Sequence, residues 1–248
     1  MNYKNCRIMT HAFFPTQSQI SQAVSGLSTS LQKYGWDVTP LSGTQFQGLA
    51  QIKIYEVLKA LKNNMGGKNM TLLVDTDCSA ISNPDNAFSY VHNFCPDEVL
   101  VSCAHERAWP VRAWGNFMKP VLTPSGRKEK YFSQLNTGVI CAKTDLLIDT
   151  LQIFMDKVCA GPEMCDQHSF YVGHNHRKHL GLKTRIDGDS VLSISMAELD
   201  WRKHFVVDEK GIKRIDVDYY PVFAHMNGRV KEIASVQRDF ESWSGKKL

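Results

Sequence analysis

Met70-Thr71-Leu72-Leu73-Val74-Asp75-Thr76-Asp77-Cys78-Ser79-Ala80-Ile81-Ser82, residues 70–82, is the stretch that decides the fold. A short apolar run ends here in two acids that are separated by one residue. A continuous apolar run of this length is typical of a strand buried on both faces, as in a mostly parallel sheet. Asp75 and Asp77 then lie at the carboxyl end of the strand, the edge where open α/β sheets bind ligands.

The two acids allow two interpretations. They are compatible with a solvated turn ahead of Asn83-Pro84-Asp85, which is the ordinary use of acids after a strand. They are also suited to a divalent cation that carries a diphosphate, because Mg²⁺ and Mn²⁺ prefer hard oxygen ligands. An Asp-x-Asp sequence alone does not decide between the two, so the rest of the chain has to.

Composition narrows the class of protein. With 248 residues and 43% hydrophobic content, the chain can form one α/β domain spanning 1–248, which can itself be part of a longer protein. The net charge of +4 is spread along the chain, which argues against a nucleic-acid partner. We expect no membrane span and a cytoplasmic location, because no long apolar segment or signal peptide is visible. Seven cysteines without regular spacing fit a reducing compartment.

The first 80 residues alternate between strand and helix patterns, as in a doubly wound parallel sheet. The expected strands are 7–14, 36–41 and 72–74, and the expected helices are 18–34 and 49–63. No Gly-x-Gly-x-x-Gly follows the first strand, and position 62 is Lys62, so neither a dinucleotide fingerprint nor a P-loop is present. A nucleotide site in this chain must therefore use carboxylates and a metal.

The remainder continues the α/β pattern without a linker or an internal repeat. We expect helices at 87–94, 145–158, 165–173 and 233–243, strands at 98–103, 135–142, 183–187, 191–195 and 221–224, and a hairpin around 208–211. The segment 111–130 looks irregular, and we interpret it as a lid over the site.

Polar side chains follow four of the expected strands, and one expected helix adds an acid. These groups are Asp75 and Asp77, His105 and Glu106, Asn136-Thr137-Gly138, His225, and Asp166. Each has an ordinary structural explanation: a buried histidine, turn chemistry or a helix cap. In a parallel sheet, however, the ends of the strands meet along one edge. The joint occurrence therefore favours a functional site.

These motifs make the sequence resemble the metal-dependent, nucleotide-sugar-using glycosyltransferases of the GT-A fold. Among them it is most similar to the glycosyltransferase domain of procollagen lysyl hydroxylases. The matching motifs, together with Trp109-Pro110, are Thr76-Asp77-Cys78, Leu135-Asn136-Thr137-Gly138, Asp166-Gln167 and His225-Met226-Asn227-Gly228-Arg229-Val230-Lys231. The resemblance spans nearly the whole chain and implies a GT-A (Rossmann-like) fold with a mixed, mainly parallel sheet flanked by helices.

The resemblance also implies an activity: transfer of a hexose or pentose from a nucleotide sugar, with UDP as the expected nucleotide, to a hydroxyl of a glycan or glycoprotein. Asp75, Asp77 and His225 would hold Mn²⁺ or Mg²⁺, and the imidazole favours Mn²⁺. Asp166 would be the catalytic carboxylate near the anomeric carbon. The donor phosphates would be held by Gly228, Lys231 and Thr76, and the substrate would be contacted by Asn136, Thr137, Gln167, Trp109 and Glu106.

The sequence departs from the family pattern at three places. Ala80 stands where the family often has a second acid, so that Asp75 replaces it in an Asp-x-Asp form. The family's Asp-Asp-Gln is Cys165-Asp166-Gln167 here, and its Gly-Asn-Gly is Met226-Asn227-Gly228. The details of metal ligation and of the sugar pocket therefore stay open.

Three other functions remain as alternatives. One is a non-catalytic domain that binds nucleotide sugars, which the retained acids argue against. Another is a metal-dependent nucleotidyltransferase, which would normally need a Gly-rich basic loop where residues 10–15 stand. The third is a zinc module, for which no Cys-x-x-Cys pair exists; its ligands would come from Cys159, Cys165, His168, His174, His176 and His179.

Overall fold

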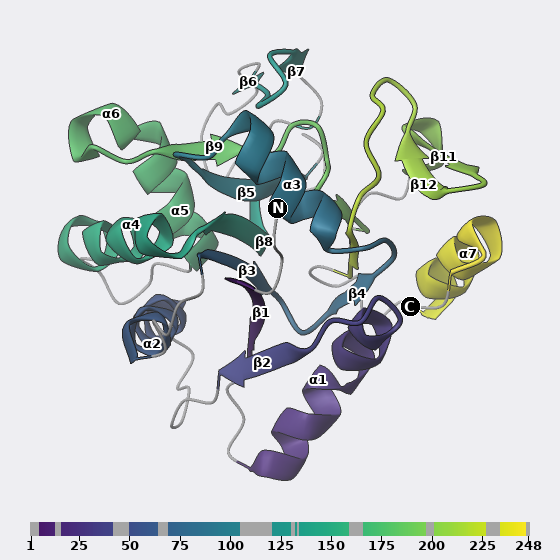
Figure 1. Ribbon diagram of the computed structural model, residues 1–248, viewed down its shortest axis with the longest axis horizontal. Helices are drawn as coiled ribbons and strands as arrows, with labels where there is room; N and C mark the ends of the chain where they lie inside the picture. Colours follow the sequence, from purple (N-terminus) through teal and green to yellow (C-terminus); the bar gives the residue numbers. More distant parts are fainter. Residues whose placement is uncertain are drawn as a thin grey trace.

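A computed structural model describes residues 5–12, 16–41, 50–63, 69–104, 121–129, 132, 134–158, 166–196, 201–226 and 234–246. Its centre is a six-stranded sheet with the order β2-β1-β3-β8-β5-β9 (Figure 1). The strands are β1 (Cys6–His11), β2 (Val38–Leu41), β3 (Met70–Val74), β5 (Val99–Ala104), β8 (Gln134–Lys143) and β9 (Thr184–Ile186). All run parallel except β8, which is antiparallel to both of its neighbours. The expected mixed, mainly parallel sheet is confirmed.

Helices cover both faces of this sheet. One face packs against α1 (Gln17–Gln32) and α3 (Asp85–Phe94), and the other against α2 (Ala50–Asn63), α4 (Thr144–Lys157) and α5 (Asp166–Asn175). The alternation of strand side chains explains the division: Leu72 belongs to the apolar cluster of the first face and Leu73 to that of the second. All five residues of β3 are buried, as the apolar run predicts. Further helices are α6 (Arg177–Leu180) and α7 (Ala234–Ser244).

The sequence accounts for the bounds of α1. Thr16 caps its N-terminus, since the hydroxyl accepts a hydrogen bond from the backbone N–H of Gln19 and the Gln19 side chain accepts one from Thr16 N. The helix ends before Gly35, whose φ of 75° is readily adopted only by a residue without a Cβ. Trp36 N then donates to Leu31 O at 3.2 Å and turns the chain toward β2.

A second, three-stranded sheet lies beside the first one and has the order β10-β13-β4. It consists of β4 (Cys78–Ala80), β10 (Ser193–Ser195) and β13 (Phe223–His225). Strand β13 runs parallel to β10 and antiparallel to β4, which places His225 opposite Cys78. The sequence did not predict β4, because three residues directly after a turn carry no periodicity.

This topology corrects one expectation. The polar groups do not all follow strands of one parallel sheet: Asn136, Thr137 and Gly138 lie near the beginning of the antiparallel β8, and His225 belongs to the second sheet. They still approach Asp75, because an antiparallel strand starts at the edge where its neighbours end. Gly138 O accepts a hydrogen bond from Asp75 N at 2.8 Å.

Two short hairpins complete the described part. The hairpin expected around 208–211 is confirmed, with β11 (Phe205–Asp208) paired to β12 (Gly211–Arg214). Within the segment expected to be irregular, residues 121–129 instead form a hairpin of β6 (Val121–Leu122) and β7 (Lys128–Glu129). Gly126, with a φ of 88°, supplies the left-handed residue of its turn, a signal that the sequence reading did not use. A 3-10 helix, Trp201–Lys203, precedes β11.

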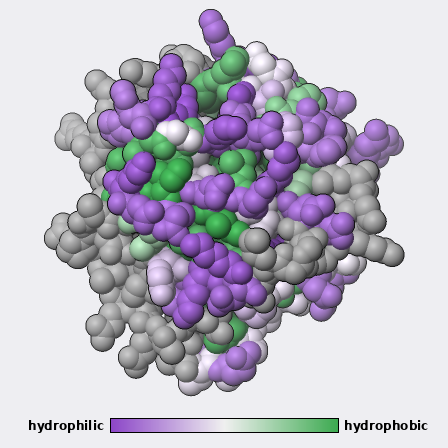
Figure 2. Space-filling view, turned by 60° about the vertical axis from the view of Figure 1, so that its left-hand side comes forward, coloured by the Kyte–Doolittle hydropathy of each residue, from purple (hydrophilic) through white to green (hydrophobic). Residues whose placement is uncertain are grey.

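The polarity of the surface can be followed on one face of the molecule. Hydrophilic side chains surround smaller apolar areas on the face drawn in Figure 2. No helix among the described residues is long and apolar enough to cross a membrane.

Buried charges hold the loop that connects β9 to β10. Asp189 accepts hydrogen bonds from Arg127 Nε at 3.2 Å and from the Tyr90 hydroxyl. Arg214 is paired with Glu129 and donates to the carbonyl oxygen of Gly188 in the same loop. Because β10 pairs with β13, this network helps to fix the strand that carries His225.

Asp187, in the same loop, makes the free energy of unfolding depend on pH in a predictable direction. Its carboxyl is fully buried, and burial raises its pKa from 3.8 to about 8. Between these values the unfolded chain releases a proton that the folded protein keeps, so the free energy of unfolding falls as the pH rises. We expect Asp187→Asn to remove a slope of up to about 1.4 kcal/mol per pH unit between about pH 5 and 8.

Urea unfolding at several pH values measures this slope, and Asp189→Asn is the matched control. Although burial opposes ionisation of Asp189, hydrogen bonds from Ser125, Tyr90 and Arg127 lower its pKa. Its replacement should therefore lower the stability by a similar amount across this pH range. If the free energy of unfolding of Asp187→Asn changed with pH in the same way as that of the wild type, the raised pKa of Asp187 would be contradicted.

Candidate metal centre

Asp75 lies between two histidines at the carboxyl end of β3. His11, the last residue of β1, places Nε2 at 3.3 Å from Asp75 Oδ1, and His225 Nε2 lies 3.8 Å from Asp75 Oδ2. The parallel pairing of β1 with β3 brings the two strand ends together. About a quarter of the Asp75 side chain remains exposed, so a ligand can reach the carboxylate.

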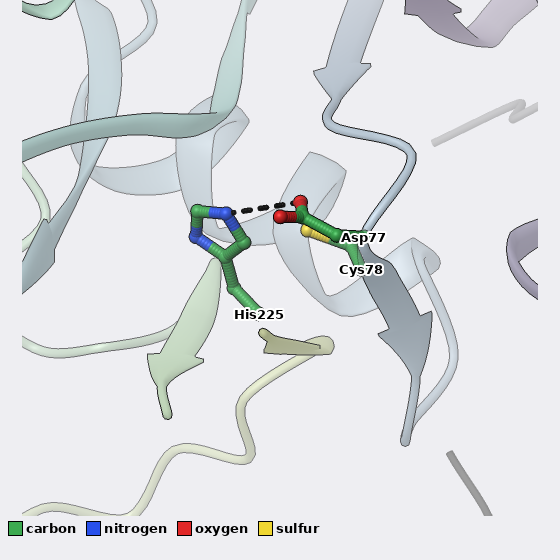
Figure 3. A group of neighbouring side chains, drawn as sticks. All are labelled: Asp77, Cys78 and His225. Carbon is green, nitrogen blue, oxygen red and sulfur yellow. Dashed lines mark ion pairs between the residues drawn. The ribbon is translucent and has the colours of Figure 1, made fainter. Parts of the chain in front are cut away.

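Asp77, in the turn before β4, and His225, at the end of the neighbouring strand β13, face each other (Figure 3). His225 Nε2 lies 3.3 Å from Asp77 Oδ1. The backbone supports this approach, because Met226 N donates to Asp77 O at 3.0 Å. The His225 side chain is 4% exposed, and its second ring nitrogen, Nδ1, has no hydrogen-bond partner among the described residues. The ring therefore meets the acids through Nε2.

Cys78 adds a third kind of donor atom. An oxygen of Asp77, the sulfur of Cys78 and a ring nitrogen of His225 all lie within 4.8 Å of one another. Asp75 is not part of this compact group, although it contacts His225. The structure thus brings together the three predicted metal ligands and adds Cys78, which was not among the predicted ligands.

Gly138 lies directly against the imidazole ring of His225. A Cβ at this position would overlap with three atoms of the His225 ring, with Nε2 at 2.6 Å. The backbone of Gly138 is held on both sides, since its N–H donates to Asn136 Oδ1 at 2.8 Å and its carbonyl accepts from Asp75 N at 2.8 Å. A residue with a side chain would therefore move His225 away from the acids.

Gly138→Ala is expected to weaken divalent-cation binding at least about tenfold, the size typical of a disturbed supporting contact at a metal site. The added methyl group occupies the place of the imidazole, which then cannot keep its distance from Asp77. Calorimetric titration with Mn²⁺ measures the loss, and thermal unfolding shows whether the fold survives. Gly26→Ala on α1 is the control, because a Cβ there meets nothing within 4 Å. Equal affinity in the two variants would contradict the steric role of Gly138.

The structure describes only some of the residues that were predicted to contact the donor or the substrate. Asn136 and Thr137 are buried at the start of β8, and Asn136 Oδ1 is engaged by Gly138. Thr76 is half-buried in the turn between the two acids, and Gln167 is half-buried near the start of α5. Asp166 is the first residue of α5, but its side chain lies outside the described part. Four further residues lie entirely outside the described part: Glu106, Trp109, Gly228 and Lys231. The substrate contacts predicted for these residues stay predictions.

Of the described histidines of the alternative zinc module, His174 is engaged elsewhere, and His176 and His179 are exposed. His174 Nδ1 lies 2.9 Å from Thr184 Oγ1, and burial together with Arg177 lowers the pKa of its imidazole to about 4. Among the described residues, the only group of potential metal ligands is Asp77, Cys78 and His225. Cys159, Cys165 and the side chain of His168 lie outside the described part.

The residues at this edge fit a divalent cation. Carboxylate, thiol and imidazole groups converge there from the ends of β3, β4 and β13. Two carboxylates that are one residue apart and partly shielded from water favour a positive charge between them. The sequence did not indicate His11, because the strand expected over 7–14 placed this histidine inside the strand, whereas β1 ends at His11.

Comparison with known proteins supports the same fold. The chain is similar to the crystal structure of a glycosyltransferase involved in the glycosylation of the major capsid of PBCV-1, with a TM-score of 0.55 and 14% sequence identity. The match covers 94% of this chain and 98% of the other. No protein-family model and no curated protein sequence matches the chain. The chain therefore shares the mixed α/β fold of a glycosyltransferase.

Proposed function

We propose that the protein is a metal-dependent glycosyltransferase of the GT-A class. In this function it moves a hexose or pentose from a nucleotide sugar, with UDP as the expected nucleotide, to a hydroxyl of a glycan or glycoprotein. The observation that carries the proposal is the convergence of Asp75, Asp77 and His225 at the carboxyl edge of a glycosyltransferase-like sheet. The motif resemblance to the glycosyltransferase domain of procollagen lysyl hydroxylases belongs to the proposal as well.

The chemistry of donor activation suits these residues. A sugar diphosphonucleotide reacts at its anomeric carbon only when the negative charge that develops on the leaving diphosphate is stabilised. Asp77 and His225, with Asp75 beside them, would hold Mn²⁺ or Mg²⁺. When bound, the cation supplies Lewis-acid stabilisation of that charge.

The remaining roles belong to the chain itself. His11 contacts one carboxylate oxygen of Asp75 while His225 lies near the other, so His11 helps to orient the carboxylate. Gly138 and Asn136 keep the imidazole in place. The side chain of Lys231 and the backbone of Gly228 would bind the phosphates, and Asp166 would act near the anomeric carbon as a base or as a stabilising carboxylate.

Release of nucleoside diphosphate from a panel of nucleotide sugars tests the proposal. Many glycosyltransferases of this kind slowly hydrolyse their donor in the absence of an acceptor, so no acceptor has to be known. We expect release from at least one donor in the presence of Mn²⁺, and none after chelation. A complete lack of turnover with every donor, in spite of tight nucleotide binding, would identify a non-catalytic binding domain instead.

A further inference from the structure

The fold places the thiol of Cys78 beside Asp77 and His225, which the sequence alone does not reveal. Cys78 opens β4 and lies directly opposite His225 in the antiparallel pairing of β4 with β13. Residues that are directly opposite in an antiparallel pair project from the same face of the sheet. Figure 3 shows both side chains next to the carboxylate of Asp77.

The thiol is held close to the acids by the same backbone that supports the imidazole. Cys78 Sγ donates to the carbonyl oxygen of Gly138 over 3.9 Å, and the ring of His225 lies against the same glycine. The sulfur, the Asp77 oxygen and the His225 nitrogen lie within 4.8 Å of one another. Cys78 is 2% exposed and Asp77 keeps about a quarter of its side chain exposed, so the carboxylate is the more accessible of these two groups.

We propose that Cys78 is a metal ligand and that it determines which cations this centre prefers. A donor set of oxygen, nitrogen and sulfur favours borderline and soft cations such as Zn²⁺, Co²⁺ and Cd²⁺ over Mg²⁺, which prefers oxygen. The ligand is the thiolate, so binding releases the thiol proton to the solvent. Zn²⁺ and Cd²⁺ therefore compete with Mn²⁺ for the centre.

This inference rests on the proposed metal centre but not on glycosyl transfer, so its test needs neither donor nor acceptor. Metal-free protein is titrated with Cd²⁺, and the ultraviolet absorption that arises from charge transfer between thiolate and Cd²⁺ is recorded. The titration is repeated with Cys78→Ser and with Cys78→Ala, whose small side chains suit a buried position. Cys95→Ala is the matched control, because Cys95 is also a buried thiol of the described part but does not belong to the ligand group.

We expect the absorption band in the wild type and in Cys95→Ala, and its loss or reduction by the signal of one thiolate in both Cys78 variants. The Cd²⁺ affinity of the Cys78 variants should fall at least about tenfold, whereas their Mg²⁺ affinity should stay near that of the wild type. Thermal unfolding of each variant verifies that it is folded.

Two outcomes would overturn the inference, and they differ in what they imply for the proposed function. If the Cys78 variants keep the full band and affinity while Asp77→Ala loses Cd²⁺ binding, the thiol is not a ligand but the metal centre stands. If the wild type binds no Cd²⁺, or if Asp77→Ala binds it unchanged, both the inference and the metal centre fail.

Discussion

Asp77→Ala is expected to lower the rate of donor breakdown by at least about three orders of magnitude. Lewis-acid stabilisation of a leaving group is worth several kcal/mol, and each 1.36 kcal/mol corresponds to about a factor of ten in rate. The variant removes the carboxylate that faces both His225 and Cys78. The fold should survive, since Asp77 lies in a turn and its side chain is about a quarter exposed.

The measurement is the rate of nucleoside diphosphate release at saturating Mn²⁺, together with thermal unfolding. Asp97→Ala is the control: this exposed acid is paired with Lys143 and precedes β5, at the opposite end of the sheet from the metal centre. Its turnover should equal that of the wild type. Normal turnover by Asp77→Ala would remove the metal centre from the mechanism.

Asp166→Asn is expected to lose most of its turnover while it still binds the metal and the nucleotide sugar with near-native affinity. Asp166 begins α5, whereas the predicted metal ligands lie at the ends of β3 and β13 and in the turn before β4. The substitution keeps the shape of the side chain but removes its negative charge. A positioned base or acid typically contributes about 10²–10⁴-fold, so kcat should fall by a factor in that range.

Calorimetric donor affinity and kcat, determined for this one variant, separate the possible roles of Asp166. If the residue only orients a sugar hydroxyl, Asn can replace it, and the change will be small and mainly in KM. Near-native kcat would remove Asp166 from the catalytic residues and would leave the metal centre untouched.

Much of the fold could be predicted from the sequence because its signals are local. The apolar run at 72–74 identifies a strand buried on both faces, and the spacing of Ile20, Val24, Leu27 and Leu31 identifies α1. The direction of β8 could not be read in this way. A strand that is buried on both faces shows the same continuous apolar pattern whether it runs parallel or antiparallel to its neighbours.

The candidate site was predicted only in part, and for a related reason. Asp75, Asp77 and His225 carry motif signals that a single sequence can show. The parts played by Cys78 and Gly138 depend on the pairing of β4 with β13 and on the packing of His225 against β8. Both contacts join segments far apart in the chain, and a three-residue strand such as β4 has too little pattern to reveal its partner.

Calorimetric titration of UDP, with Mn²⁺ present and after chelation, tests the central claim most directly. If the centre holds a cation that binds the donor diphosphate, Mn²⁺ should strengthen UDP binding at least about tenfold, a coupling of about 1.4 kcal/mol. UMP, which lacks the diphosphate, should gain less, and in His225→Ala the gain for UDP should shrink. An equal affinity for UDP with Mn²⁺ and with chelator would contradict the account.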